Sequence, residues 1–382
     1  MKLVDIITGT RPNFMKVAPL IAALQEDLNK GGAIAYRLIH TGQHANPEMS
    51  TIFWEELNMP RPDINLEVHY CHSLYEHREA IRKQYEVVLR QQQPDLVIVV
   101  GDCTSTLACA LATKSVSKTI RLAHVEAGIR CWDDAMPEEY NRVMTDRLSD
   151  YFFTTTRFAS KNLEQEGLHA ENIFFVGNTM IDTLLTRLPC LNRPELADQL
   201  QLGDQEYFVL TMHRRANILS PGAARETIRH IMSGAAGRPV IFPIHPHTAQ
   251  KLDISELIFP NLHVVAPMSY LEFNYLVKHA KAVITDSGGI TEEASVLNIP
   301  CMTLRDTTER PETCLVGSNE LVGTTEDKIL PAFEKLFSGN WKTGTAPELW
   351  DGNTSKRIVQ LLNEVIFQTG IAGLKASGRL PV

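Results

Sequence analysis

One stretch of the chain, residues 286–293, combines the residue types that bind a nucleotide. Ser287, Gly288 and Gly289 follow an apolar run and precede residues with the apolar spacing of a helix. The first N–H groups of a helix lack partners, and glycines let an anion approach them closely. Glu293, one turn further on, could accept a hydrogen bond from a ribose. The stretch predicts a pyrophosphate–ribose site, with an ordinary glycine turn as the alternative.

Two cations occupy a similar junction near the N-terminus. An apolar run over residues 3–7 leads into a glycine turn, and a helix is expected from about residue 14 to 28. Arg11 and Lys16 lie where the helix dipole favours acids. A bound anion would resolve this conflict, whereas a pair of solvated charges is the plain alternative.

Carboxylates follow two other apolar runs of the same half. Asp102 and Glu126 each come directly after a predicted buried strand, where a carboxylate is costly without a partner. Asp102 could instead cap the next helix. Glu138 has an ordinary explanation, since acids favour helix starts and its spacing predicts an ion pair with Arg142.

The C-terminal half repeats this pattern of apolar runs followed by charged residues. His213, Arg214 and Arg215 follow a predicted strand over residues 207–212, and Arg310 lies in a charged segment after another strand. Cations of this kind suit a diphosphate. Carboxylates on the same rim suit proton transfer beside it.

Alternating strands and helices in both halves predict an α/β protein with two doubly wound, Rossmann-like domains facing each other across a cleft. Loops at the carboxyl ends of parallel strands carry ligand sites, so these polar residues should meet in that cleft. We expect an N-terminal domain over residues 1–178 and a C-terminal domain over residues 179–353. A helix over about 354–370 is expected to pack back on the first domain.

Composition narrows the function class. A net charge of −8 over 382 residues argues against a nucleic-acid partner. Seven scattered cysteines without a CxxC pair favour a reducing cytoplasm and give no metal site. We expect no signal peptide and no membrane span. A mobile loop over residues 65–74 is expected to carry His69, His72 and His77 as solvated side chains, because their spacing fits no zinc pattern.

Taken together, nine motifs in a fixed order carry a family resemblance. The chain resembles the non-hydrolysing UDP-N-acetylglucosamine 2-epimerases from residue 2 to about residue 325. The motifs are Gly9-Thr10-Arg11-Pro12, Thr41-Gly42-Gln43-His44, Gly101-Asp102, His124-Val125-Glu126-Ala127-Gly128, Pro137-Glu138-Glu139, Gly177-Asn178-Thr179, His213-Arg214-Arg215, Thr285-Asp286-Ser287-Gly288-Gly289 and residues 305–312.

The resemblance implies a glycosyltransferase-B type fold and a homodimer. It implies inversion at C2 of UDP-GlcNAc to give UDP-ManNAc, with neither a metal nor another cofactor. The implied route is elimination of UDP to a 2-acetamidoglucal and re-addition after protonation of C2 from the opposite face.

The resemblance also assigns roles by motif. We expect Asp102 to act on one face of the sugar and Glu126 or Glu138 on the other. The implied catalytic residues are Asp102, Glu126, Glu138 and His213. The implied substrate contacts are Arg11, Lys16, Ser287, Gly288, Gly289, Glu293 and Arg310, with Phe273 at the uracil.

A second UDP-GlcNAc activates many relatives, and the matching residues here are Gln43, His44, Glu138, Arg214 and His245. The loop that contributes an Arg-Gln or Glu-Gln pair in those relatives reads Leu74-Tyr75-Glu76-His77-Arg78 instead. Activation therefore stays open. The same loop could accommodate a modified sugar such as a 3-acetamido uronic acid derivative.

Three other functions compete with the epimerase. A hydrolysing relative would release ManNAc and UDP. A glycosyltransferase of the same fold would need an acceptor and leave C2 untouched. A silent UDP-sugar binding module would lose its N-terminal acids, yet Asp102 and Glu126 are both present.

Overall fold

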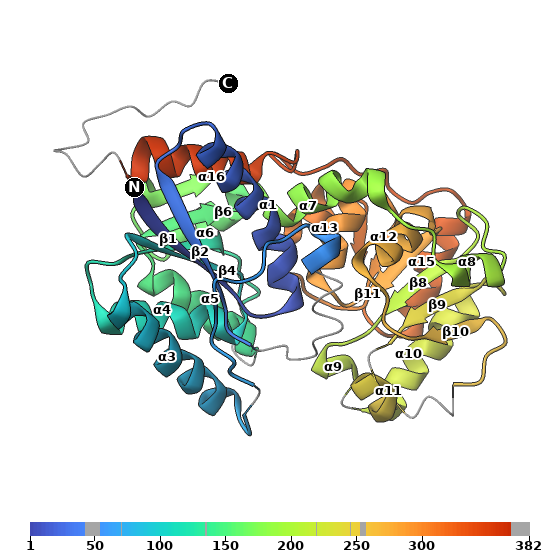
Figure 1. The fold of residues 1–382 in the computed structure, drawn as a ribbon. Coiled ribbons are helices and arrows are strands. Elements are labelled where there is room, and N and C mark those ends of the chain that lie inside the picture. The colour runs from blue at the N-terminus through green and yellow to red at the C-terminus, as the bar shows by residue number, and fades with distance from the viewer. Residues whose placement is uncertain are drawn as a thin grey trace.

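A computed structural model of the chain describes residues 1–42, 54–69, 71–133, 136–218, 220–244, 246–252 and 257–367. Two parallel sheets lie beside each other, and buried side chains cover both faces of each (Figure 1). The prediction of two doubly wound α/β domains is confirmed. No helix in these ranges has both the length and the apolar composition to cross a bilayer.

In the N-terminal domain the described strands form one sheet in the order β3-β2-β1-β4-β5-β6-β7. β4 (Leu96–Val100) is apolar throughout because its side chains alternate between two cores. The other strands are β1 (Lys2–Thr8), β2 (Ile34–His40), β3 (Ile64–Asn65), β5 (Arg121–Ala127), β6 (Tyr151–Thr154) and β7 (Ile173–Phe175). The helices are α1 (Arg11–Asn29), α3 (Leu74–Gln91), α4 (Thr104–Val116), α5 (Pro137–Leu148) and α6 (Arg157–Gln165).

In the C-terminal domain the order is β10-β9-β8-β11-β12-β13. The strands are β8 (Phe208–Thr211), β9 (Val240–Pro243), β10 (Leu262–Val265), β11 (Ala282–Thr285), β12 (Cys301–Thr303) and β13 (Asn319–Leu321). The helices are α8 (Glu195–Gln199), α9 (Arg215–Ile218), α10 (Pro221–Gly234), α11 (Pro246–Leu252), α12 (Tyr270–His279), α13 (Gly288–Val296), α14 (Pro311–Leu315) and α15 (Glu326–Phe337).

Each sheet reverses its strand order at one point, between β1 and β4 in the first sheet and between β8 and β11 in the second. Ligands of open α/β sheets bind in the crevice beyond such a point. The loops that leave these four strands lead to Arg11, Asp102, His213 and Ser287. The topology therefore brings the predicted site residues of each half to one edge.

Two helices join the domains. α7 (Thr179–Arg187) lies against both α1 and α13, and Thr183 Oγ1 donates to the carbonyl oxygen of Met15 at 2.5 Å. α16 (Thr354–Leu361) runs beside α1 (Figure 1), where Ile358 and Leu362 are fully buried. The carboxylate of Asp182 accepts from the first N–H groups of α16, at 3.1 and 2.7 Å.

Three local predictions need correction. β5 extends through Glu126, which sits at a bulge with φ of +70° rather than in the loop beyond the strand. α3 begins at Leu74, so His77 is a buried helical residue and not part of a loop. β3 and β13 were not predicted, because strands of two or three residues are too short to show an apolar period.

Candidate active site

The two domains meet at the carboxylate of Glu126. Lys16 Nζ donates to Glu126 Oε2, and Arg310 Nη2 from the other domain lies 4.0 Å from the same oxygen. All three side chains are at least nine-tenths buried. Glu126 Oε1 is buried and has no hydrogen-bond partner among the described residues. The structure thus brings together one carboxylate and two cations that the sequence placed 110 or more residues apart.

The carboxylates near this cluster stabilise the charged forms of its two cations. Burial alone would lower the pKa of Lys16, but Glu126 and Asp102 outweigh it and raise that pKa. The pKa of Arg310 is likewise raised, because Glu292, Glu126 and Glu309 outweigh the cost of burial. Both cations therefore stay charged at neutral pH and suit a departing diphosphate.

Glu292, which the sequence analysis did not single out, holds Arg310. Arg310 Nε donates to Glu292 Oε1, and the Glu292 side chain is fully buried on α13. Burial raises the pKa of Glu292 despite this partner. Of the neighbours Glu292 and Glu293, the sequence pointed only to Glu293, and the role of Glu292 appears only in its tertiary contact with Arg310.

The turn after β4 closes the cluster on one side. Gly101 has φ of +69°, and a Cβ built there would lie 3.2 Å from Lys16 Nζ. His124 Nε2 donates to the Gly101 carbonyl oxygen at 2.9 Å, and its Nδ1 shares a 2.6 Å hydrogen bond with Asp146. This buried pair fixes the turn that carries Asp102.

Asp102 is more exposed than Glu126, with 36% of its side chain accessible to solvent. Its Oδ2 lies 3.9 Å from Arg142 Nη2. Burial alone would raise the pKa of Asp102, but Arg142, Lys16 and Arg310 outweigh it and lower that pKa. The N-cap of α4 is Cys103, without a side-chain cap bond. Asp102 is therefore an ionised carboxylate facing the cluster and not a helix cap.

The predicted ion pair of Glu138 with Arg142 is wrong. Glu138 is exposed, with no ion pair among the described residues, and Arg142 pairs with Glu139 at 3.3 Å. Glu139 is buried and accepts from the backbone N–H groups of Cys131 and Trp132. Of the two neighbouring acids, Glu139 holds the loop and Glu138 is left free to face solvent.

On the other domain, a buried aspartate orients His213. Asp286 Oδ1 lies 2.8 Å from His213 Nδ1, while the Asp286 carboxylate also accepts from the backbone N–H groups of His213 and Arg214. His213 is 58% exposed and Asp286 is fully buried. Asp286 follows a strand as Asp102 does, so the same signal could have identified it.

Arg214 and Arg305 compensate another buried acid of this domain. Arg214 Nη2 lies 2.8 Å and Arg305 Nη1 2.6 Å from the Glu309 carboxylate. Burial alone would raise the pKa of Glu309, but Arg214, Arg310 and Arg305 lower it to about 2. A Cβ at Gly288 would approach Glu309 Oε1 to 2.8 Å, so glycine lets α13 start beside this acid.

The predicted Ser-Gly-Gly junction is confirmed as a strand, a turn and a helix, with Ser287 as the N-cap of α13. Gly289 faces α7, where a Cβ would lie 3.2 Å from Met180 Cε. Glu293 lies one turn into the helix, 4% exposed, and accepts from Tyr270 Oη at 2.7 Å. Burial raises the pKa of Glu293 to about 7.

The chain is similar to known proteins over most of its length. A family model described as UDP-N-acetylglucosamine 2-epimerase matches residues 26–363. The chain belongs to the UDP-N-acetylglucosamine 2-epimerase family. A UDP-N-acetylglucosamine 2-epimerase of Methanocaldococcus jannaschii is 39% identical, with 95% of this chain and 99% of the relative covered. A UDP-2,3-diacetamido-2,3-dideoxy-D-glucuronate 2-epimerase of Pseudomonas aeruginosa is 36% identical over 86% of this chain and 90% of the relative.

Solved members of the epimerase family have the same fold. The UDP-GlcNAc 2-epimerase of M. jannaschii in complex with UDP-GlcNAc and UDP superposes with a TM-score of 0.85 at 38% identity, covering 95% of this chain and 99% of that one. A sucrose-phosphate synthase at 12% identity, with a TM-score of 0.58, shares the fold alone. The glycosyltransferase-B type architecture is thus confirmed for this epimerase-family chain.

The elements of this epimerase-family member place Arg11 and Phe273, whereas three other predicted residues lie outside the described part of the chain. Gln43, His44 and His245 lie outside the described residues. Arg11 begins α1 and is half-buried, and burial lowers its pKa. Phe273 on α12 packs partly buried against the second domain's core.

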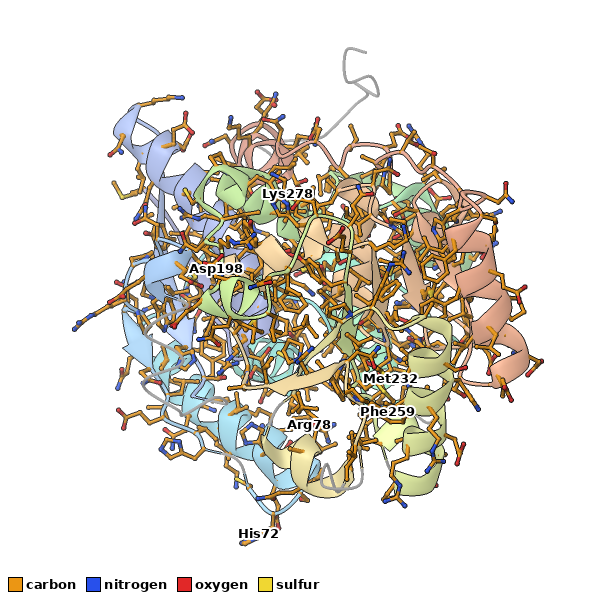
Figure 2. All side chains as sticks on the ribbon, turned by 90° about the vertical axis from the view of Figure 1, so that its right-hand side faces the viewer. His72, Arg78, Asp198, Met232, Phe259 and Lys278 are labelled. Atoms are coloured by element: carbon orange, nitrogen blue, oxygen red, sulfur yellow. The ribbon has the colours of Figure 1, made fainter. Side chains whose placement is uncertain are left out.

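Two histidines that were expected in one loop, His72 and His77, lie in different surroundings. His72 is exposed at the outer edge of the molecule (Figure 2), whereas His77 is fully buried in α3. Burial lowers the pKa of His77, opposed by a hydrogen bond with the backbone of His69. No group of three or more His, Cys, Asp or Glu side chains within the described ranges could hold a metal ion.

Proposed function

We propose that this protein interconverts UDP-N-acetylglucosamine and UDP-N-acetylmannosamine by inversion at C2, without net hydrolysis. The contact of Glu126 with both Lys16 and Arg310 carries the proposal, because it unites a carboxylate with the cations of both domains. Membership of the family and the likeness to an epimerase solved with UDP-GlcNAc and UDP support it.

In the proposed first half-reaction, a carboxylate removes the C2 proton while the C1–O bond breaks. The electron pair of that bond leaves with UDP, and the sugar becomes a 2-acetamidoglucal. Lys16, Arg310 and the start of α13 would stabilise the departing diphosphate. In the second half-reaction C2 takes a proton on the opposite face, and a phosphate oxygen of UDP bonds to C1.

We assign the acid–base work to Asp102 on one face and Glu126 or Glu138 on the other, with His213 beside the diphosphate. The lowered pKa of Asp102, in which Arg142 and Lys16 outweigh burial, keeps this carboxylate ionised at neutral pH. Only the ionised form can accept the C2 proton. Glu293 would accept from the ribose, Ser287, Gly288 and Gly289 would face the diphosphate, and Phe273 would lie at the uracil.

Incubation of the purified protein with UDP-GlcNAc in deuterated water tests the reaction. We expect UDP-ManNAc to form and deuterium to appear at C2 of both UDP-GlcNAc and UDP-ManNAc. NMR spectroscopy detects both changes. Free UDP rising in step with free sugar would favour hydrolysis instead. An unchanged C2 proton with no product would reject the proposal for this substrate.

The 36% identical glucuronate 2-epimerase of P. aeruginosa supports a second candidate substrate, a UDP-linked 2,3-diacetamido uronic acid. The same exchange assay with both UDP-sugars, compared by kcat/KM, decides between them. The proposal also includes activation by a second UDP-GlcNAc, which sigmoidal initial rates would reveal. It includes a homodimer, which light scattering would detect.

A further inference from the structure

The side chain of Tyr270 links Glu293 to the core of the first domain. Its hydroxyl donates to Glu293 Oε1 at 2.7 Å, and its side chain is 5% exposed. Although Tyr270 begins α12 of the second domain, it packs in the same buried cluster as Leu57 and Met59 of the first. The proposed mechanism uses Glu293 but gives Tyr270 no part.

The backbone of Tyr270 is anchored across the domain boundary as well. Its N–H donates to Glu56 Oε2 of the first domain at 2.9 Å. Within α12, Ser269 and Glu272 form a capping box, so Ser269 Oγ accepts from the N–H of Glu272 at 3.3 Å. Glu56 therefore satisfies a different N–H from the local cap, and its carboxylate suits the positive end of the helix.

The Tyr270 hydroxyl counters the effect of burial on Glu293. Burial raises the pKa of Glu293 to about 7, while hydrogen bonds with Tyr270 and Asn274 lower it and the charge of Glu292 raises it. A hydroxyl that donates to one carboxylate oxygen also fixes the plane of the carboxylate. Each carboxylate oxygen can accept more than one hydrogen bond, so the Glu293 carboxylate fixed in this way can still accept from a ligand.

We propose that Tyr270 is a positioning residue that aims the Glu293 carboxylate at the ribose hydroxyls of UDP and fixes it to the first domain. This inference rests on the proposed function, in which Glu293 accepts from the ribose. It predicts that loss of the Tyr270 hydroxyl weakens recognition of the ribose and leaves recognition of the diphosphate intact.

Calorimetric titration of Tyr270→Phe with UDP and with 2′,3′-dideoxy-UDP tests this. We expect the wild type to prefer UDP, and Y270F to lose about tenfold in UDP affinity, the scale of one charge-assisted hydrogen bond. Its affinity for dideoxy-UDP should not change. An equal loss for both ligands, or an unchanged preference for UDP, would overturn the inference.

Tyr207→Phe is the matched control. Tyr207 is also buried, and its hydroxyl donates to the Leu276 carbonyl oxygen of the same helix at 2.8 Å, away from Glu293. Y207F should keep the full preference for UDP, and thermal unfolding of both variants verifies folding. Loss of the preference in Y207F as well would reduce Tyr270 to a packing role. A wild type without any preference would instead refute the ribose contact itself, and with it this inference.

Discussion

At the residue scale, the site is a set of charges that are stable only together. Glu126, Lys16, Arg310 and Glu292 are each nearly inaccessible to solvent, and each touches a neighbour of opposite charge. Buried charges of this kind are costly when a partner is removed. Asp102 differs because it is partly open, so it can change with less effect on folding.

Asp102→Asn should keep UDP binding and lose C2 exchange by about 10²–10⁴-fold, the usual share of one general acid or base. The amide keeps the size of the side chain but cannot take a proton. Calorimetry with UDP and NMR of deuterium incorporation measure the two effects separately. Turnover equal to that of the wild type would remove Asp102 from the mechanism.

Arg310→Ala should weaken UDP binding by about 1.5–3 kcal/mol, the scale of a charge-assisted contact. The structure adds a second effect, because the variant strands Glu292 and should lower the free energy of unfolding by about 3–5 kcal/mol. The double variant R310A/E292Q is the control. It should recover part of the stability while UDP binding stays weak, as denaturant titration and calorimetry would measure.

At the element scale, the helices that carry the site are held by contacts distant from it. Asp182 of α7 accepts from two N–H groups at the start of α16, whose own N-cap residue, Asn353, makes no side-chain cap bond. This is a helix cap supplied from another element. It fastens the returning chain to the helix that lies between α1 and α13.

Asp182→Ala should therefore lower the free energy of unfolding by about 1–3 kcal/mol, since two buried N–H groups lose their acceptor. The value of kcat should stay near that of the wild type. Asp351→Ala is the comparison, because Asp351 is 47% exposed and pairs with Arg357 near the same helix. Exposed pairs contribute less than about 1 kcal/mol. Equal losses in urea titrations of the two variants would contradict the cap.

Elements were also what the sequence predicted best. The apolar run at 96–100 matches β4, and the glycine junction at 287–289 starts α13 as expected. Partners were harder to predict, because ion pairs are made between residues far apart in the chain. The ion pair with Arg142 was expected of Glu138 but is made by Glu139, and Glu292 was passed over. Neighbouring acids on a helix start look alike until the fold buries one of them.

At the scale of the whole molecule, the buried acids make stability depend on pH. Glu293 has its pKa raised by burial from an ordinary 4.5 to about 7, and burial raises that of Glu312 to about 7 as well. Between these values the folded state holds protons that the unfolded state has released. The contribution of each acid to stability is therefore fully present below pH 4.5 and is lost as the pH rises through 7.

Glu293→Gln should accordingly stabilise the unliganded protein at pH 8, by about 1–3 kcal/mol, and have little effect at pH 4.5. Chemical unfolding of wild type and variant across this range measures the difference. The same variant should bind UDP less tightly. A stability difference independent of pH would show that Glu293 ionises freely in the folded protein.

The chain passes between the two domains at two helices, and these connections limit how the domains can move apart. The outgoing helix α7 and the returning helix α16 both rest on α1, and α1 also carries Lys16. A rotation of the second domain about these two attachments leaves Lys16 beside Glu126, because both belong to the first. The same rotation withdraws Arg310, whose Nη2 lies 4.0 Å from Glu126. Any such displacement would leave Lys16 as the remaining cation beside Glu126 within this cluster.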